Sequence, residues 1–189
     1  MKRSEINILI HQADECFKIC GWTLPPNPRW DVTDFGLGNW QSFGLVLVNL
    51  AEEREYCEKL MYARKGMTTP AHTHKKKKED IICRWGLLEI LLWANPMQHD
   101  SESITVKING NPREVSCGKP LQLHSGERIT LVPGVYHEFS SASGECIIGE
   151  VSTANDDTND NFFINPDIGR YPYIDEDEPA YLRLLSEPA

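Results

Sequence analysis

Residues 66–86 read GMTTPAHTHKKKKEDIICRWG, and this stretch decides the fold and the chemistry that we expect of the chain. It places His72 and His74 one residue apart and the carboxylate of Glu79 five residues further on. Because alternate residues of a β-strand point to the same face, both imidazoles can reach one ion. Glu79 would lie on the opposite face of a continuous strand, so we expect a turn within the four lysines at 75–78.

A fourth metal ligand is expected from a later strand, at His137, which follows the turn sequence Pro133-Gly134. Three imidazoles and one carboxylate form a mixed set of nitrogen and oxygen donors. Such a set suits Mn²⁺ or Fe²⁺ with two open coordination positions, and less often Zn²⁺, Co²⁺ or Ni²⁺. The general affinity order of these metals gives no basis for choosing one of them. The sequence therefore predicts a site for a divalent metal at His72, His74, Glu79 and His137.

Length, charge and cysteine usage limit the class of protein. A chain of 189 residues, 40% of them hydrophobic, can bury one core and is short for two. Its net charge of -9 would repel a phosphate backbone, so we expect no nucleic-acid partner. No stretch approaches the roughly 18 apolar residues of a membrane helix, and residues 1–15 lack the apolar region of a signal peptide. The six cysteines form no CxxC pair, which indicates reduced thiols. We expect a single cytoplasmic domain without membrane contact.

Hydrophobic periodicity divides the chain into three parts. Residues 4–20 carry apolar side chains at helical spacing and precede Gly21, which predicts an amphipathic helix, whereas the Pro-, Gly- and Trp-rich residues 22–44 favour an irregular loop. Seven segments rich in β-forming residues follow, which predicts an all-β sandwich or barrel over about 45–153: residues 45–51, 55–66, 86–96, 103–110, 127–134, 136–141 and 145–152. Residues 154–189 are expected to wrap the outside of the barrel and to end in a short helix over 179–185.

The spacing of the candidate ligands resembles the two sequence motifs of the cupin superfamily. The first motif, G-x5-H-x-H-x(3,4)-E-x6-G, is matched in full by Gly66, His72, His74, Glu79 and Gly86. The second, G-x5-P-x-G-x2-H-x3-N, is matched by Gly126, Gly134 and His137, with the proline moved next to Gly134 and Ser141 in the last position. The resemblance implies the cupin fold, a double-stranded β-helix or jelly-roll barrel.

A closer resemblance covers most of the chain. Residues 24–26 (LPP), 58–86 (EKLMYARKGMTTPAHTHKKKKEDIICRWG) and 149–172 (GEVSTANDDTNDNFFINPDIGRYP) are similar to D-lyxose isomerases of the cupin type. The resemblance implies a manganese-dependent isomerase that interconverts D-lyxose and D-xylulose, usually as a homodimer. Thr73, Lys75 and residues 83–85 depart from the residues usual in that family, which leaves the sugar preference open.

Moving a proton between neighbouring sugar carbons requires a base, and a positive group stabilises the negative charge that develops on oxygen. Glu150 is the candidate base because it interrupts an apolar strand; the alternative is a hydrogen-bonded or outward-facing carboxylate. Lys77 shares a face with Glu79 if strand geometry resumes after the turn, and the family resemblance points to the same lysine. Its three neighbours are expected to be solvated.

Asp160 and Arg170 are candidates for binding sugar hydroxyls. The alternative for Asp160 is a turn former, because clustered Asn and Asp residues favour turns. The alternative for Arg170 is an ion pair with the acidic residues 175–178.

Two other functions fit the same metal ligands. One is a cupin oxygenase, because Fe²⁺ with open positions also suits O₂ activation. The other is a metal-containing module that binds sugars or regulates without doing chemistry. A cation and a free carboxylate beside the metal favour proton transfer over oxygen chemistry, so we expect a metal-dependent aldose–ketose isomerase.

Overall fold

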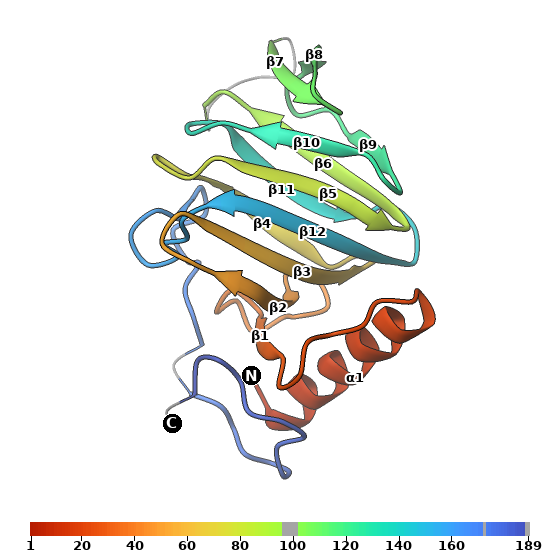
Figure 1. Cartoon of the computed structure of the whole chain (residues 1–189). Helices are drawn as coiled ribbons and strands as arrows, with labels where there is room; N and C mark the ends of the chain where they lie inside the picture. Colours follow the sequence, from red (N-terminus) through yellow and green to blue (C-terminus); the bar gives the residue numbers. More distant parts are fainter. Residues whose placement is uncertain (96–101, 172, 188–189) are drawn as a thin grey trace.

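The structure, a computed structural model, describes residues 1–95, 102–171 and 173–187 and consists of two antiparallel β-sheets with one helix outside them (Figure 1). The larger sheet contains, in spatial order, β1 (Arg29–Thr33), β2 (Leu45–Glu52), β3 (Tyr56–Arg64), β12 (Glu145–Thr153), β5 (Glu79–Trp85), β10 (Arg128–Leu131), β7 (Ser103–Ile108) and β8 (Asn111–Ser116). The smaller sheet contains β13 (Phe162–Phe163), β4 (Thr68–Thr73), β11 (Tyr136–Ser141), β6 (Leu87–Trp93) and β9 (Leu121–His124).

The main hydrophobic core fills the space between the two sheets. Strand β6 follows the alternation that one buried face requires, with Leu88, Ile90 and Leu92 almost fully buried. From the larger sheet, Ile81 of β5 and Ile148 of β12 join the same cluster. This shared core fixes the two sheets relative to each other, so residues on their inner faces are held at defined separations. The expected all-β barrel is confirmed.

Helix α1 (Arg3–Ile19) covers the outer face of the larger sheet at its β1 end (Figure 1). Its apolar stripe, which includes Ile6, Leu9 and Phe17, is fully buried and packs with Trp30 of β1 in a second hydrophobic cluster. Gly21 has φ +77°, a left-handed conformation that favours glycine after a helix. The predicted N-terminal helix is therefore confirmed.

Residues 175–187 form a strap along the start of α1. Residues 162–163, which were expected to wrap the outside of the barrel, instead pair with β4 as β13 of the smaller sheet. The helix predicted over 179–185 is wrong. None of the described residues in this range is helical. Instead, Lys2 forms a parallel bridge with Asp175, and the Arg3 guanidinium lies 2.7 Å from Glu176 and 2.6 Å from Glu187. These contacts with α1 hold the strap extended, because its polar groups find partners across the chain and not within a helical turn.

Six strands lie outside the seven predicted segments: β1, β4, β5, β8, β9 and β13. Of these, β4 was expected from the spacing of His72 and His74 alone. Strand β1 falls in the stretch expected to be an irregular loop, where its register with β2 places Trp30 opposite Val48. Strand β8 is almost wholly exposed, so it carries no hydrophobic alternation by which to recognise it. It pairs with β7 through the Asn109-Gly110 turn, whose φ angles of +51° and +83° suit a tight hairpin.

No helix among the described residues combines the length and the apolar character needed to cross a membrane.

Candidate active site and metal centre

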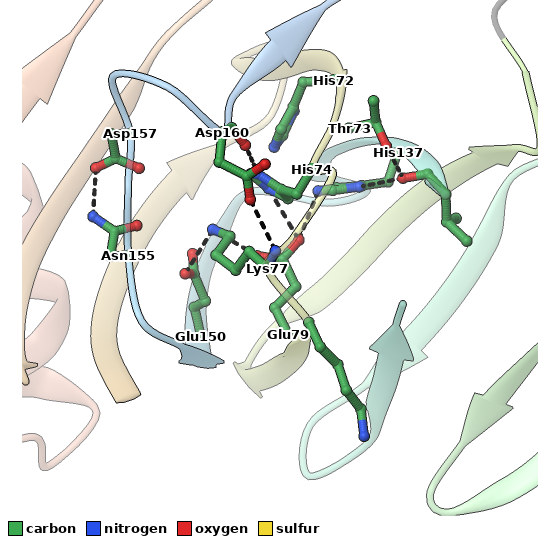
Figure 2. Close-up of polar contacts among 12 residues, drawn as sticks. His72, Thr73, His74, Lys77, Glu79, His137, Glu150, Asn155, Asp157 and Asp160 are labelled. Atoms are coloured by element: carbon green, nitrogen blue, oxygen red, sulfur yellow. Dashed lines mark hydrogen bonds and ion pairs between the residues drawn. The ribbon is translucent and has the colours of Figure 1, made fainter. Parts of the chain in front are cut away.

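Three histidines meet on the inner face of the smaller sheet. His72 lies on β4, His74 follows directly after that strand, and His137 on β11 is paired with His72 in the register of the two strands. All three side chains are buried, and their candidate ligand atoms lie within 4.8 Å of one another (Figure 2). The shared face predicted from the spacing of residues 72 and 74 is confirmed, and antiparallel pairing adds the third imidazole.

Each imidazole is oriented by a main-chain carbonyl. The Nδ1 atoms of His72, His74 and His137 lie 2.7, 2.5 and 3.3 Å from the carbonyl oxygens of Pro70, Asp160 and Val135. A carbonyl only accepts, so Nδ1 must donate, and the lone pair of each neutral ring then lies on Nε2. Burial, together with the neighbouring imidazole of His137, holds the pKa of His72 well below its ordinary value, which keeps that ring neutral.

Glu79 brings a carboxylate to the histidines from the opposite sheet. It is the first residue of β5, and its Oε1 lies 3.0 Å from Nε2 of His137 and 3.5 Å from Nε2 of His74. These three buried atoms nevertheless form no well-directed hydrogen bond with any described residue. Buried nitrogen and oxygen atoms that converge in this way fit a divalent cation, and the donor set is the mixed one expected from the sequence.

The turn between His74 and Glu79 falls in the lysine run, and it buries only one of the four lysines. Lys77 is 5% exposed, whereas Lys75, Lys76 and Lys78 are exposed, as expected. The Asp160 carboxylate accepts hydrogen bonds from the main-chain N–H groups of residues 75, 76 and 77 at 2.8 to 3.1 Å. One carboxylate therefore shapes the turn that directs Lys77 inward.

The Lys77 ammonium joins two buried carboxylates. Its Nζ lies 2.9 Å from Oε2 of Glu79 and 3.1 Å from Oε1 of Glu150, which stands on β12 (Figure 2). Burial opposes the charged form, but Glu150 and Glu79 raise the pKa of Lys77 above its ordinary value, so the ammonium keeps its charge. Burial alone would likewise raise the pKa of Glu79, yet Lys77 and His137 hold it well below the ordinary value.

The histidines, Glu79, Lys77 and Glu150 line a common cavity of about 470 Å³. This volume is in the range of small-molecule sites, which is about 300–1,000 Å³. Apolar side chains such as Met61, Phe139 and Phe163 form part of the wall. The remainder is polar and comes from β1, from β3 and from residues 157–170. The cavity therefore offers both hydrophobic walls and hydrogen-bonding groups to a ligand.

Arg170 also lines the cavity, where its Nη2 lies 2.7 Å from Oδ1 of Asp31. The alternative expected for Arg170, a pair with the acidic residues 175–178, is wrong. Arg170 pairs with Asp31, and the side chains of residues 176–178 bind α1. Asp160 is not among the described residues that line the cavity, and main-chain N–H groups occupy its carboxylate. Its expected contact with sugar stays a prediction that this placement does not support, and the alternative of a turn former agrees with its hydrogen bonds.

Sequence reasoning missed Lys59 of β3, a second buried ammonium at the cavity. It is 5% exposed and shares a face of its strand with Cys57, Met61 and Ala63, each at most 1% exposed. A lysine among apolar side chains at alternate positions was the signal that could have found it. Asp31 and Asp157 also line the cavity, and neither has a comparable signal in the sequence.

The protein is thus a cupin barrel in which three imidazoles that could hold a metal ion, two carboxylates and a lysine surround one cavity, as in an enzyme active site. A family model described as D-lyxose isomerase matches residues 27–187. The D-lyxose/D-mannose isomerase of Escherichia coli O157:H7 is 43% identical, over 99% of this chain and 98% of that one. The D-lyxose ketol-isomerase of Cohnella laeviribosi is 29% identical, over 87% and 92%. The chain belongs to the D-lyxose isomerase family, which consists of aldose–ketose isomerases.

Solved structures of sugar isomerases share the fold. A mutant L-ribose isomerase from Acinetobacter sp. DL28, in complex with L-ribose, superposes with a TM-score of 0.67 at 16% identity, over 92% of this chain and 98% of that one. The L-ribose isomerase of Cellulomonas parahominis with L-ribose gives 0.66 at 16% identity, over the same shares. The predicted cupin fold and the family resemblance are thus both confirmed.

The arrangement predicts that each of four substitutions, His72→Ala, His74→Ala, Glu79→Ala and His137→Ala, weakens metal binding. Removing one donor from the set should lower the metal retained after dialysis at least roughly tenfold, measured by plasma mass spectrometry on protein loaded with Mn²⁺. His124→Ala, which removes an exposed imidazole on β9, is the control and should retain the metal. A variant of the four that keeps the full metal content would not be missing a ligand.

Proposed function

We propose that this chain is a metal-dependent isomerase that interconverts D-lyxose and D-xylulose through an enediolate. The observation that carries the proposal is the Lys77 ammonium, which contacts both a carboxylate of the candidate metal site and the separate carboxylate of Glu150. Proton transfer at a carbon next to a carbonyl requires such a base and such a cation. Membership of the D-lyxose isomerase family supports the isomerase over the oxygenase and the binding module.

We propose His72, His74, Glu79 and His137 as the ligands of one divalent cation. A cation held there would act as a Lewis acid that polarises the sugar carbonyl. The buried acceptor atoms that converge between the two sheets support this ligand set. We favour Mn²⁺ because of the mixed donor set and the family resemblance, with Fe²⁺, Zn²⁺, Co²⁺ and Ni²⁺ as the alternatives.

Glu150 is the proposed base. Its carboxylate takes the proton from C2 of the aldose. The electron pair of the broken C–H bond forms the C1=C2 bond of the enediolate, and the π pair of the C1 carbonyl moves onto O1. Glu150 then returns the proton to C1, while the O2 hydroxyl proton passes to O1 and a carbonyl forms at C2. The position of Glu150, which lines the cavity and contacts the Lys77 ammonium, supports this role.

Lys77 is the proposed electrophilic group. Its ammonium lies where it can donate to a sugar oxygen on which negative charge develops, without giving up its contact with Glu79. Arg170, held by Asp31, is the proposed donor to the more distant sugar hydroxyls. D-Mannose is the second aldose to test, because the relative from E. coli carries that sugar in its name.

We further propose that the protein is a cytoplasmic homodimer, as the family resemblance implies. Cys16, Cys20, Cys57, Cys83 and Cys146 form no disulfide, which agrees with a reducing compartment.

Lys77→Met, which keeps most of the stem and removes the charge, is expected to lower kcat by roughly 10² or more, because the developing oxyanion loses its donor. Bound metal should be retained. Lys76→Met is the matched control, since Lys76 is the exposed neighbour in the same turn, and it should leave kcat within about twofold. Equal losses in the two variants would mean that the lysine run acts as a general positive field.

The reaction itself is tested by running D-lyxose with the metal-loaded enzyme in D₂O and without oxygen. We expect D-xylulose to form anaerobically and to carry deuterium at C1, because the proton on Glu150 exchanges with solvent during the enediolate lifetime. Glu150→Gln should lose the label and all but a residual turnover, since the amide cannot accept the proton. Turnover that depends on O₂ would refute the isomerase, whereas anaerobic turnover without label would point to a hydride shift and remove Glu150 from its role.

A further inference from the structure

Lys59 is a buried cation for which the reaction as described so far has no use. Its side chain is 5% exposed, lines the cavity, and stands on β3 directly opposite Glu150 in the register of β3 with β12. Its Nζ lies 3.6 Å from Oε1 of Glu150. Taking an ammonium out of water costs several kcal/mol unless partners compensate, so a purely structural barrel position would be better filled by an apolar residue.

The charges around Glu150 leave its two carboxylate oxygens in different environments. Lys77, from the turn before β5, and Lys59, from β3, both approach Oε1, at 3.1 and 3.6 Å. Among the residues that the structure describes, the only side-chain hydrogen bond to the Glu150 carboxylate goes to Oε1, and none goes to Oε2. Since Glu150 lines the cavity, the oxygen that is free to receive a proton from a ligand is Oε2. Two cations on one oxygen thus orient the whole carboxylate.

Lys59 also ties this carboxylate to the segment that follows β12. Its Nζ lies 3.1 Å from Oδ1 of Asn155, as a hydrogen bond, and 3.6 Å from Oδ1 of Asp157, as an ion pair. Burial opposes the charge of Lys59, but Glu150 and Asp157 raise its pKa above the ordinary value, so it remains an ammonium. The same segment carries Asp160, which shapes the turn that directs Lys77. Residues 155–160 therefore contact the partners of Glu150 on two sides.

We propose that Lys59 is a positioning residue for Glu150: it holds Oε1, together with Lys77, so that Oε2 faces the sugar, and it couples this orientation to the docking of residues 155–157. The proposal rests on the proposed isomerase function, because it assumes that Glu150 transfers the proton. Lys59 does not itself bind the sugar or exchange a proton with it. Its loss should therefore slow the transfer and leave sugar binding nearly unchanged.

A double-mutant cycle with Lys59→Met and Glu150→Gln tests the proposal on the Mn²⁺-loaded enzyme with D-lyxose. Lys59→Met alone should lower kcat about 10- to 100-fold, with KM changed by less than about threefold. In the Glu150→Gln background the same change should have almost no further effect, because a residue that acts through Glu150 has nothing left to position. Losses that multiply, or a rise in KM with kcat intact, would overturn the proposal.

A second measurement does not depend on activity. Hydrogen exchange of residues 154–161, followed by mass spectrometry, should be faster in Lys59→Met than in the wild type. The control is Lys65→Met, at an exposed lysine just after β3, which should leave both exchange and kcat unchanged. Unchanged exchange in Lys59→Met would overturn the proposed coupling to this segment. A wild-type enzyme that isomerises no sugar would refute the proposed function, and the exchange result would still decide whether Lys59 holds the segment.

Discussion

The contacts of one buried carboxylate, Glu79, hold the site together. It stands at the start of β5 in the larger sheet, and its Oε1 meets the imidazoles of His74 and His137 from the smaller sheet. Its Oε2 meets Lys77, which in turn reaches Glu150 on β12. A charge at 2% exposure is tolerated only when it is paired on every side, so the two sheets, the lysine turn and the metal donors have to fit one another.

The same constraint explains why an acidic chain gathers its densest positive run beside the candidate metal ligands. Three of the four lysines are exposed. The turn places the fourth, Lys77, between the carboxylates of Glu79 and Glu150. Asp160 sets the path of this turn through its side chain, while its main-chain carbonyl orients His74. The segment after β12 thereby shapes both the metal site and the position of the proposed electrophile, although its sequence resembles an ordinary polar loop.

The sequence predicted the parts of the site that depend on local spacing and missed the parts that depend on distant pairing. The shared face of His72 and His74 follows from strand periodicity. The turn before Glu79 follows from the offset of five residues between His74 and Glu79, which would put the two side chains on opposite faces of a continuous strand. Lys59 and Asp31 reach the cavity only because β3 pairs with β12 and β1 pairs with β2, which no local pattern states. The prediction of a helix over 179–185 was wrong for a related reason. The strap of residues 175–187 makes contacts with Arg3 at a distance in the sequence in place of the local hydrogen bonds that a helix would need.

Every proposed role in the reaction depends on a cation that binds between the two sheets with Glu79 as one of its ligands. Crystals grown with Mn²⁺ and measured at the manganese absorption edge would place the ion directly. We predict one anomalous peak at roughly 2.0–2.3 Å from Nε2 of His72, His74 and His137 and from a carboxylate oxygen of Glu79. An ion bound elsewhere, or one held by the imidazoles without Glu79, would contradict the account.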